Sequence, residues 1–226
     1  MSIAAGLVVL LVMWLLSDGL PRAEAPGGGP RASNPAEARA QLGRLSVVAA
    51  RPHVSGYQRA CGPEQGCTFG NGWMPSGQGA GCTTRDLVLA SQLSKIKYAN
   101  GSRCHVVAGA LADPYTGTKI QLTPASPGAV QIDHIFPLAA AFDLGAAKWP
   151  QSQRNQFAQD LDELVAVSGS ANAAKGDSTP GEWMPAAVSY RCSYAARYVA
   201  VAAKYSLSIT KADEAALSAA LSRCPA

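Results

Sequence analysis

The chain has 226 residues, of which 48% are hydrophobic and 15% are charged, and its formal net charge is +4. This length fits one globular domain behind an export signal and leaves too little chain for a second full domain. The small positive charge favours anionic partners only slightly, because many proteins with such a charge never bind nucleic acid. Composition therefore sets the size of the fold and excludes little about its chemistry.

The N-terminal segment is typical of an export signal. Its first sixteen residues, MSIAAGLVVLLVMWLL, are apolar and uncharged, and Ala23-Glu24-Ala25 forms a small-x-small cleavage motif. Because the run is short for a bilayer core of about 30 Å, we predict a cleaved signal peptide over residues 1–25, with an uncleaved anchor as the alternative. Residues 26–50 are predicted to form a Gly- and Pro-rich linker and an N-terminal helix. We therefore expect a secreted or cell-envelope monomer without stable membrane association, whose domain spans 51–226.

The elements predicted for this domain mix helices and strands. Hydrophobic spacing, β-branched runs and turn residues indicate them. Thr83 or Thr84 is a plausible N-cap for the second helix, and Ser170 lies near the start of the helix after the last strand. In chain order we predict a helix in 35–48, a Gly-rich loop in 51–81, a helix in 83–98, a hairpin in 104–123, a strand in 129–136, helices in 138–149 and 150–161, a strand in 163–167, a short helix in 169–177, and helices in 188–206 and 211–223.

Six cysteines follow the predicted signal, and an even number in an exported chain favours disulfides. Zinc is the alternative, but the chain has no C-x-x-C pair and its histidines are not spaced as partners for the cysteines. Proximity in the sequence predicts three bridges, namely Cys61–Cys67, Cys82–Cys104 and Cys192–Cys224.

Polar residues with chemical potential end the apolar strand 129–136, where Asp133 and His134 come shortly before Pro137. The pair alone is weak evidence, because a turn aspartate beside a hydrogen-bonded histidine is the commoner explanation. The next strand leads into a short helix that carries Asn172, so the order is strand, strand, helix. Adjacent strand residues point to opposite faces, so the strand must twist or end here if Asp133 and His134 are to approach one cation.

A resemblance to a known family covers nearly the whole predicted mature chain. It is carried by GCTTRD, CHVVAGALADPYTG, IDHIFPLAAAFDLGAAKW, QRNQFAQDL, LVAVSGSANAAKGDSTPGEWMP and YRCSYAARYVAVAAKYSLSIT. These stretches resemble exported HNH proteins related to the C-terminal domain of GmrSD-type restriction endonucleases. The resemblance implies an α+β fold with an HNH (ββα-metal) core, a small antiparallel sheet, inserted helices and a disulfide-stapled C-terminal helical pair. It also implies metal-dependent hydrolysis of phosphodiester bonds in a nucleic acid, with DNA the expected substrate and RNA a further one.

The resemblance also implies roles for single residues. His134 is the general base that deprotonates water, while Asp133 and Asn172 hold one Mg²⁺ or Mn²⁺, which oxygen ligands suit. Lys175, three residues after Asn172 on the same helical face, and Arg85 are candidates for substrate phosphate contacts. A solvated lysine and a structural ion pair of Arg85 with an acid are the alternatives.

The chain departs from this family pattern at two positions. Glu163 stands nine residues before Asn172, where the pattern has an Asn that braces the loop, and a carboxylate lacks amide donors. Thr83 stands in Cys82-Thr83-Thr84-Arg85-Asp86, where the family usually has Cys-Asp-Thr-Arg-Asn. An exported binding protein for an anionic polymer, with the HNH fold but without catalysis, is therefore the alternative. A serine or cysteine hydrolase is disfavoured, because the chain lacks a nucleophile elbow and its cysteines are expected to be oxidised.

Overall fold

The structure is a computed structural model that describes residues 34–60, 67–70, 72, 73, 75 and 81–224. The predicted signal peptide, the start of the linker and Cys61 lie outside the described residues. No helix in the described part is long and apolar enough to cross a membrane. The α+β class expected from the sequence is confirmed, with small antiparallel sheets and two disulfides among the described residues.

One antiparallel sheet contains β2 (Ser94–Tyr98), β3 (Val106–Ala112) and β4 (Lys119–Leu122). The predicted hairpin is confirmed by β3 and β4, which pair from Ala112 with Lys119 to Gly109 with Leu122. The Asp113 carboxylate organises the turn by accepting hydrogen bonds from the backbone N–H groups of Tyr115 and Thr116. Such a side-chain bond to the following backbone is the usual reason for aspartate at the start of a turn.

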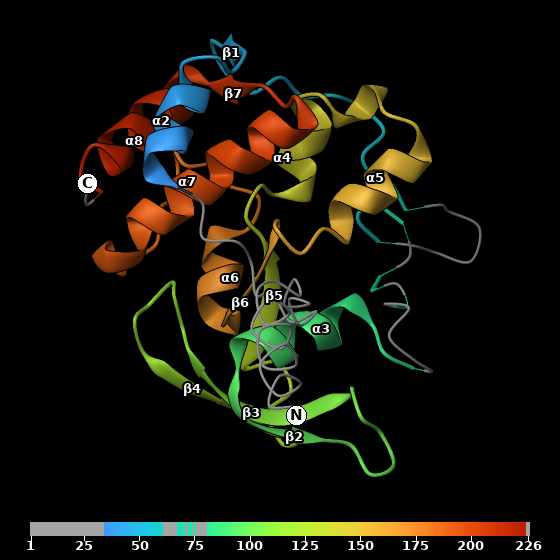
Figure 1. Ribbon diagram of the computed structural model, residues 1–226. Coiled ribbons are helices and arrows are strands. Elements are labelled where there is room, and N and C mark those ends of the chain that lie inside the picture. The colour runs from blue at the N-terminus through green and yellow to red at the C-terminus, as the bar shows by residue number, and fades with distance from the viewer. Residues whose placement is uncertain (1–33, 61–66, 71, 74, 76–80, 225–226) are drawn as a thin grey trace, which may run out of the picture.

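The second antiparallel pair contains β5 (Val130–His134) and β6 (Leu164–Ser168), with Asp133 opposite Val165 and His134 opposite Leu164. The next element is α6 (Gly169–Lys175), so the predicted order of strand, strand and helix is present. The side chain of Ser168, and not that of Ser170, caps this helix by accepting a hydrogen bond from the N–H of Ala171. Figure 1 shows β5, β6 and α6 between the three-stranded sheet and the large helices.

The predicted helix over 83–98 is only partly correct. The helix α3 (Thr84–Gln92) begins at an N-cap by Thr83, whose hydroxyl forms a capping box with Asp86. The chain then turns into β2, with Lys95 at a φ of 52°. Residues 94–98 become a strand because β3 offers them a hydrogen-bonding partner, and tertiary pairing overrides a weak local preference for helix.

Helices pack on one side of the β5–β6 pair. The predicted C-terminal helices and the predicted helix over 150–161 are confirmed, whereas the predicted helix over 138–149 is divided into an α-helix and a 3-10 helix. The N-terminal helix packs against the C-terminal pair, whose neighbour β7 pairs with β1. The elements are α2 (Pro35–Leu42), β1 (Val47–Val48), α4 (Leu138–Asp143), the 3-10 helix η1 (Ala146–Lys148), α5 (Gln151–Ala158), α7 (Val188–Tyr205), β7 (Ile209–Thr210) and α8 (Lys211–Leu221).

The β5–β6 pair lies between two hydrophobic clusters. Val165 and Val167 belong to the larger cluster with the helices, whereas Ile132, Leu164 and Ala166 belong to a smaller one with α3 and β3. Every residue of β6 is therefore buried. The strand pair is a rigid support for any side chain at its ends, because close-packed cores resist displacement.

Two of the predicted disulfides, Cys82–Cys104 and Cys192–Cys224, are confirmed. The first ties the start of α3 to the start of β3, and the second ties α7 to the segment after α8. Cys67 is also disulfide-bonded, but its predicted partner Cys61 lies outside the described residues. The described part of the chain holds no free cysteine, which agrees with the prediction of disulfides over zinc-binding thiols.

Candidate active site

The end of β5 places Asp133 and His134 in two different environments. Asp133 makes its hydrogen bonds in the interior with Tyr115 and Lys175, whereas His134 contacts Ala158 and Trp73. This separation follows from the alternation of side chains along a strand. The structure therefore does not direct the two neighbouring side chains toward one common centre.

Asp133 is held in a buried ion pair. Its two oxygens lie 3.0 Å and 2.8 Å from the Lys175 Nζ, and the Tyr115 hydroxyl donates to one of them. The side chain of Lys175 has no exposed area, and its ammonium also donates to the backbone carbonyl of His134, at 2.8 Å. The expectation of a Lys175 that faces a substrate phosphate is therefore corrected, because the ammonium neutralises an interior carboxylate.

Glu163 braces the chain immediately after His134. Its Oε1 accepts a hydrogen bond from the N–H of Phe136, and its backbone carbonyl accepts one from the N–H of Ile135, both at 2.9 Å. Complete burial raises the pKa of Glu163 well above its usual range, and the charge of Lys175 only partly opposes this. A protonated carboxyl regains one O–H donor, so Glu163 is a closer substitute for the family's Asn than an ionised carboxylate is.

The His134 ring is held in one orientation. Its Nε2 lies 3.0 Å from the carbonyl oxygen of Ala158, and Trp73 stacks on it with centroids 5.8 Å apart and planes at 6°. Burial lowers the pKa of His134 to about 4, and the charges of Lys175 and Arg59 lower it further. The hydrogen bond to Ala158 and the charge of Asp133 oppose this decrease. The ring is therefore neutral at pH 7. Because a carbonyl only accepts, Nε2 carries the proton and Nδ1 keeps a lone pair that can accept one.

His134 also lines a cavity of about 210 Å³. Phe69, Trp73 and Leu138 give this cavity apolar walls, and Arg59 adds an exposed positive charge. The arrangement can thus bring a neutral base, an enclosed volume and a cation together. Trp73 and Arg59 were not identified from the sequence, because they lie in an irregular Gly-rich loop without any periodic signal.

Both expected metal ligands, Asp133 and Asn172, have hydrogen-bonding partners within the protein. Both oxygens of Asp133 are engaged by Lys175, and the Asn172 amide donates to Gln131 Oε1 at 2.9 Å. Among the described residues, no group of three or more His, Cys, Asp or Glu side chains could hold a metal ion. The donor types would suit Mg²⁺ or Mn²⁺, but a resident ammonium already neutralises the only carboxylate of the expected set.

The second departure from the family pattern has a structural explanation. Asp86 completes the capping box of Thr83 and also accepts from the N–H of Val106, at 3.1 Å, and pairs with His105, at 3.2 Å. These contacts hold the pKa of Asp86 below its usual value despite the opposing effect of burial. Arg85 donates to the carbonyl of Val130 at 3.1 Å, so its observed partner is backbone. Thr83 and Asp86 thus support α3, and His105 belongs to the same group of contacts.

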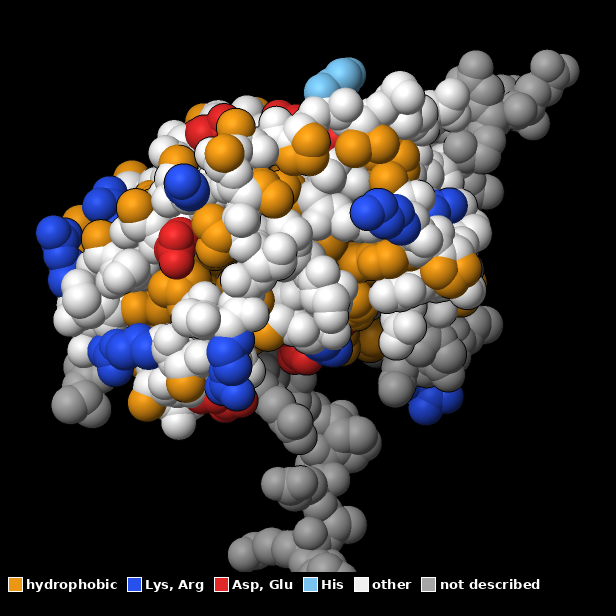
Figure 2. Space-filling view, turned by 90° about the horizontal axis from the view of Figure 1, so that it is seen from above, with side chains coloured by type: hydrophobic (Ala, Val, Ile, Leu, Met, Phe, Trp, Pro, Cys, Tyr) orange, Lys and Arg blue, Asp and Glu red, His pale blue; other side chains and the backbone are white. Residues whose placement is uncertain are grey.

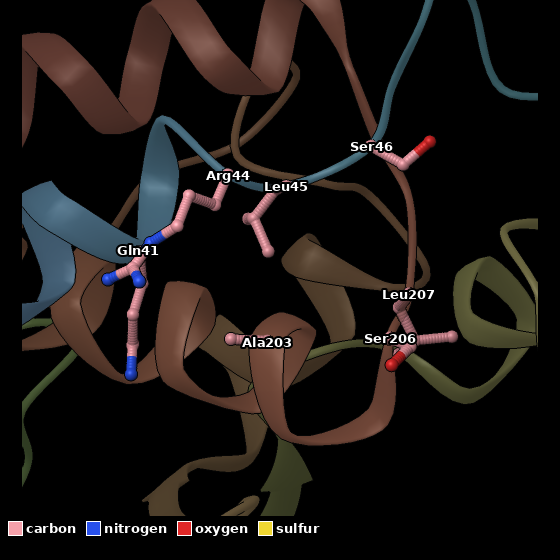
Figure 3. A pocket seen from close by; sticks show the side chains of 7 residues that line it. All are labelled: Gln41, Arg44, Leu45, Ser46, Ala203, Ser206 and Leu207. Carbon is pink, nitrogen blue, oxygen red and sulfur yellow. The ribbon is translucent and has the colours of Figure 1, made fainter.

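A second cavity, of about 460 Å³, shares no lining residue with the cavity of His134 (Figure 3). Its lining comes from the end of α2 with the residues that follow it and from the end of α7 with the residues that follow that helix. The lining residues are Gln41, Arg44, Leu45, Ser46, Ala203, Ser206 and Leu207. Its lining contains no acid, histidine or cysteine, so it has no candidate base or metal ligand. In Figure 2 the Lys and Arg side chains on the visible face form separate small groups, which agrees with the scattered basic residues of the sequence.

Fold and site together define a disulfide-linked α+β domain with a strand-end histidine in a cavity. The family model for the C-terminal domain of GmrSD restriction endonucleases matches residues 83–220. An uncharacterized secreted protein from Arthroderma benhamiae is 39% identical over 145 residues, which are 63% of this chain and 68% of that protein. The chain therefore belongs to the family of the GmrSD restriction endonuclease C-terminal domain. No solved structure matches it.

Proposed function

We propose that this protein is an exported endonuclease that hydrolyses phosphodiester bonds of DNA, with RNA as a further substrate. The observation that carries the proposal is a neutral His134 that lines a cavity while its Nε2 is held by the carbonyl of Ala158. Membership of a restriction endonuclease domain family supports the reaction class. The HNH identity of the β5–β6–α6 unit is part of the same proposal, supported by the order of its elements.

In the proposed reaction His134 Nδ1 removes a proton from a water molecule, which attacks the phosphorus and displaces the 3′ oxygen. The Ala158 carbonyl accepts from Nε2 throughout and stabilises the imidazolium that forms, while Trp73 keeps the ring in its plane. A histidine with a pKa of about 4 is a weak base in the free protein. An anionic phosphate in the cavity raises this pKa, because a nearby negative charge favours the protonated ring.

Metal dependence is a separate part of the proposal. Mg²⁺ or Mn²⁺ at Asp133 and Asn172 requires that the Lys175 ammonium leaves Asp133 first. Titration with Mn²⁺, followed by calorimetry, should show binding by the wild type that Asp133→Asn weakens at least tenfold. Equal affinity in both proteins would exclude this ligand set.

Export through a cleaved signal over residues 1–25 is also proposed. The apolar run with its Ala-Glu-Ala motif and the relative named a secreted protein support it. We further propose a monomer with nucleic acid as its partner. Mass spectrometry of the protein purified from culture medium should give an N-terminus at Pro26.

The test of the proposed function is cleavage of supercoiled plasmid by the purified protein with Mg²⁺ or Mn²⁺ and with EDTA. His134→Ala should lower the rate by about 10²- to 10⁴-fold, the usual contribution of a general base. The matched control is His53→Ala, because His53 is exposed and does not line the cavity. This variant should cleave plasmid like the wild type. Circular dichroism melts should be similar for all three proteins. Undiminished cleavage by His134→Ala would remove the assigned base.

A catalytically inactive binding protein is the second candidate, favoured by the engagement of Asp133 with Lys175. It would bind a labelled DNA duplex or heparin without any cleavage in the plasmid assay. Glu163→Asn then tests the family departure, since recovery of cleavage would show that this residue had caused the loss. No effect of Glu163→Asn on an active wild type would show that a protonated Glu163 is tolerated.

A further inference from the structure

Arg59 lines the same cavity as His134 and belongs to a part of the chain that the family match does not cover. The match begins at residue 83, whereas the wall of the cavity that contains Arg59, Phe69 and Trp73 precedes it. This wall therefore lies outside the residues that the family model matches. Its residues face the base that the matched domain supplies.

The charge of Arg59 acts on two other side chains that line the cavity. This charge lowers the pKa of His134 and opposes the rise that burial causes in the pKa of Tyr57. Arg59 is exposed and forms no ion pair with any acid in the described part of the chain. Lys175, the other cation near His134, is buried on Asp133 and offers nothing to a ligand. Arg59 is therefore the accessible positive charge of this cavity among the described residues.

The cavity suits a small anion better than a base. At about 210 Å³ it holds roughly seven waters of about 30 Å³ each, which is room for a phosphate group with its nearest waters. Apolar walls at Phe69, Trp73 and Leu138 lower the local dielectric and strengthen an interaction between a guanidinium and a phosphate. The planar guanidinium matches two phosphate oxygens in a bidentate contact.

We propose that Arg59 binds the non-bridging oxygens of the phosphate that the His134-activated water attacks. This inference rests on the proposed nuclease function. Arg59 would hold the scissile phosphate next to Nδ1 and neutralise the charge that grows on its oxygens in the transition state. The wall that precedes the matched domain then provides the substrate contact, and the matched domain provides the base.

The test compares Arg59→Gln and Arg59→Lys with Arg44→Gln as the matched control. Arg44 is exposed and lines the second cavity, whose lining does not include His134 (Figure 3). Binding of a short fluorescein-labelled DNA duplex is measured by anisotropy at several NaCl concentrations in the His134→Ala background, where cleavage does not interfere. Plasmid cleavage is measured in the wild-type background.

Arg59→Gln should lower kcat/KM at least tenfold and reduce the slope of log affinity against log salt by about 1, the value for one phosphate contact. Arg59→Lys should recover only part of the rate, because an ammonium lacks the bidentate fork. Cleavage and slope equal to those of Arg44→Gln would overturn the role of Arg59 while the nuclease function stood. A wild type that neither binds nor cleaves DNA would overturn both proposals.

Discussion

The two sides of the strand β5 differ sharply although Asp133 and His134 are neighbours. On the Asp133 side the carboxylate is buried and has Lys175 and Tyr115 as partners. On the His134 side the ring lines a cavity with an exposed Arg59 and keeps one nitrogen without a bound proton. One residue of the pair therefore serves the interior and the other faces the space where a substrate can lie. Strand alternation makes this division possible.

The interior side also shows how a core accommodates three ionisable groups. The Asp133 and Lys175 charges neutralise each other, and burial raises the pKa of Glu163, which disfavours a second negative charge in the core. An unpaired charge in a core costs several kcal/mol, so this combination avoids the largest penalty. Substitutions on either side of β5, and one remote from both, can therefore test this division.

The largest effect on stability is expected when Lys175→Met removes the ammonium. Asp133 is then an uncompensated buried charge, and the free energy of unfolding should fall by about 3–5 kcal/mol. Urea unfolding followed by circular dichroism measures this change. The double variant Asp133→Asn with Lys175→Met should regain much of the loss, because neither charge is left alone. If Lys175→Met were as stable as the wild type, Asp133 would not need the Lys175 ammonium as its partner in the interior.

On the His134 side of β5, Trp73→Leu should change the pH dependence of cleavage. Without the stacked indole, water reaches His134 and its pKa rises from about 4 toward the ordinary value of about 6.5. The wild-type kcat/KM should stay level from pH 7 to about 5 and fall as pH approaches 4. In Trp73→Leu the fall should begin near pH 6.5, with a loss of about tenfold or more at pH 5. A parallel loss at every pH would indicate a merely structural role for Trp73.

The same lowered pKa affects stability in a defined direction. Between pH 6.5 and 4 the unfolded chain binds a proton at His134 that the folded chain does not. Acidification through this window should therefore destabilise the fold, and His134→Gln should reduce that dependence. Thermal melts of both proteins between pH 4 and 7 measure the difference.

Glu163→Gln should produce an effect of the opposite pH sense. Because burial raises the pKa of Glu163, the folded chain keeps a proton that the unfolded chain loses above pH 4.5. The wild type should thus lose stability relative to Glu163→Gln as pH rises from 4 to 8, while the two proteins have similar Tm values near pH 4. Glu214→Gln, at an exposed acid, is the control and should show no such trend. A trend equal to the control would mean that Glu163 is ionised in the fold.

The smallest effect is expected from Thr83→Ala, which is remote from both sides. Loss of the N-cap of α3 should cost about 1 kcal/mol and lower Tm by about 2–4 °C. Thr83→Ser keeps the hydroxyl and should retain most of the stability. Cleavage should be unchanged in both variants, because the departure at Thr83 serves the capping box. A selective loss of cleavage at full stability would assign Thr83 a functional role.

Several features of this protein were determined locally by its sequence. The turn that begins at Asp113 defines the hairpin, because its carboxylate bonds the backbone of the next residues. The bridges Cys82–Cys104 and Cys192–Cys224 join cysteines that are near in the chain. The order of two strands and a helix around His134 follows from an apolar run, a short second run and a polar, small-residue segment. The turn and the element order depend on residues a few positions apart, and each of the two bridges joins consecutive cysteines of the chain, 22 and 32 residues apart, so a sequence displays both kinds of feature.

The tertiary structure alone decided the environment of each polar residue. Lys175 reaches Asp133 only because α6 packs beside β5, which an exposed helical face in the sequence does not reveal. Residues 94–98 left the predicted helix because β3 pairs with them. Arg59 and Trp73, which lie in an irregular loop, line the same cavity as His134, and Trp73 stacks on its ring. Burial, pKa and access depend on residues distant in the chain, so the sequence indicates His134 as a candidate whereas the packing determines what surrounds it.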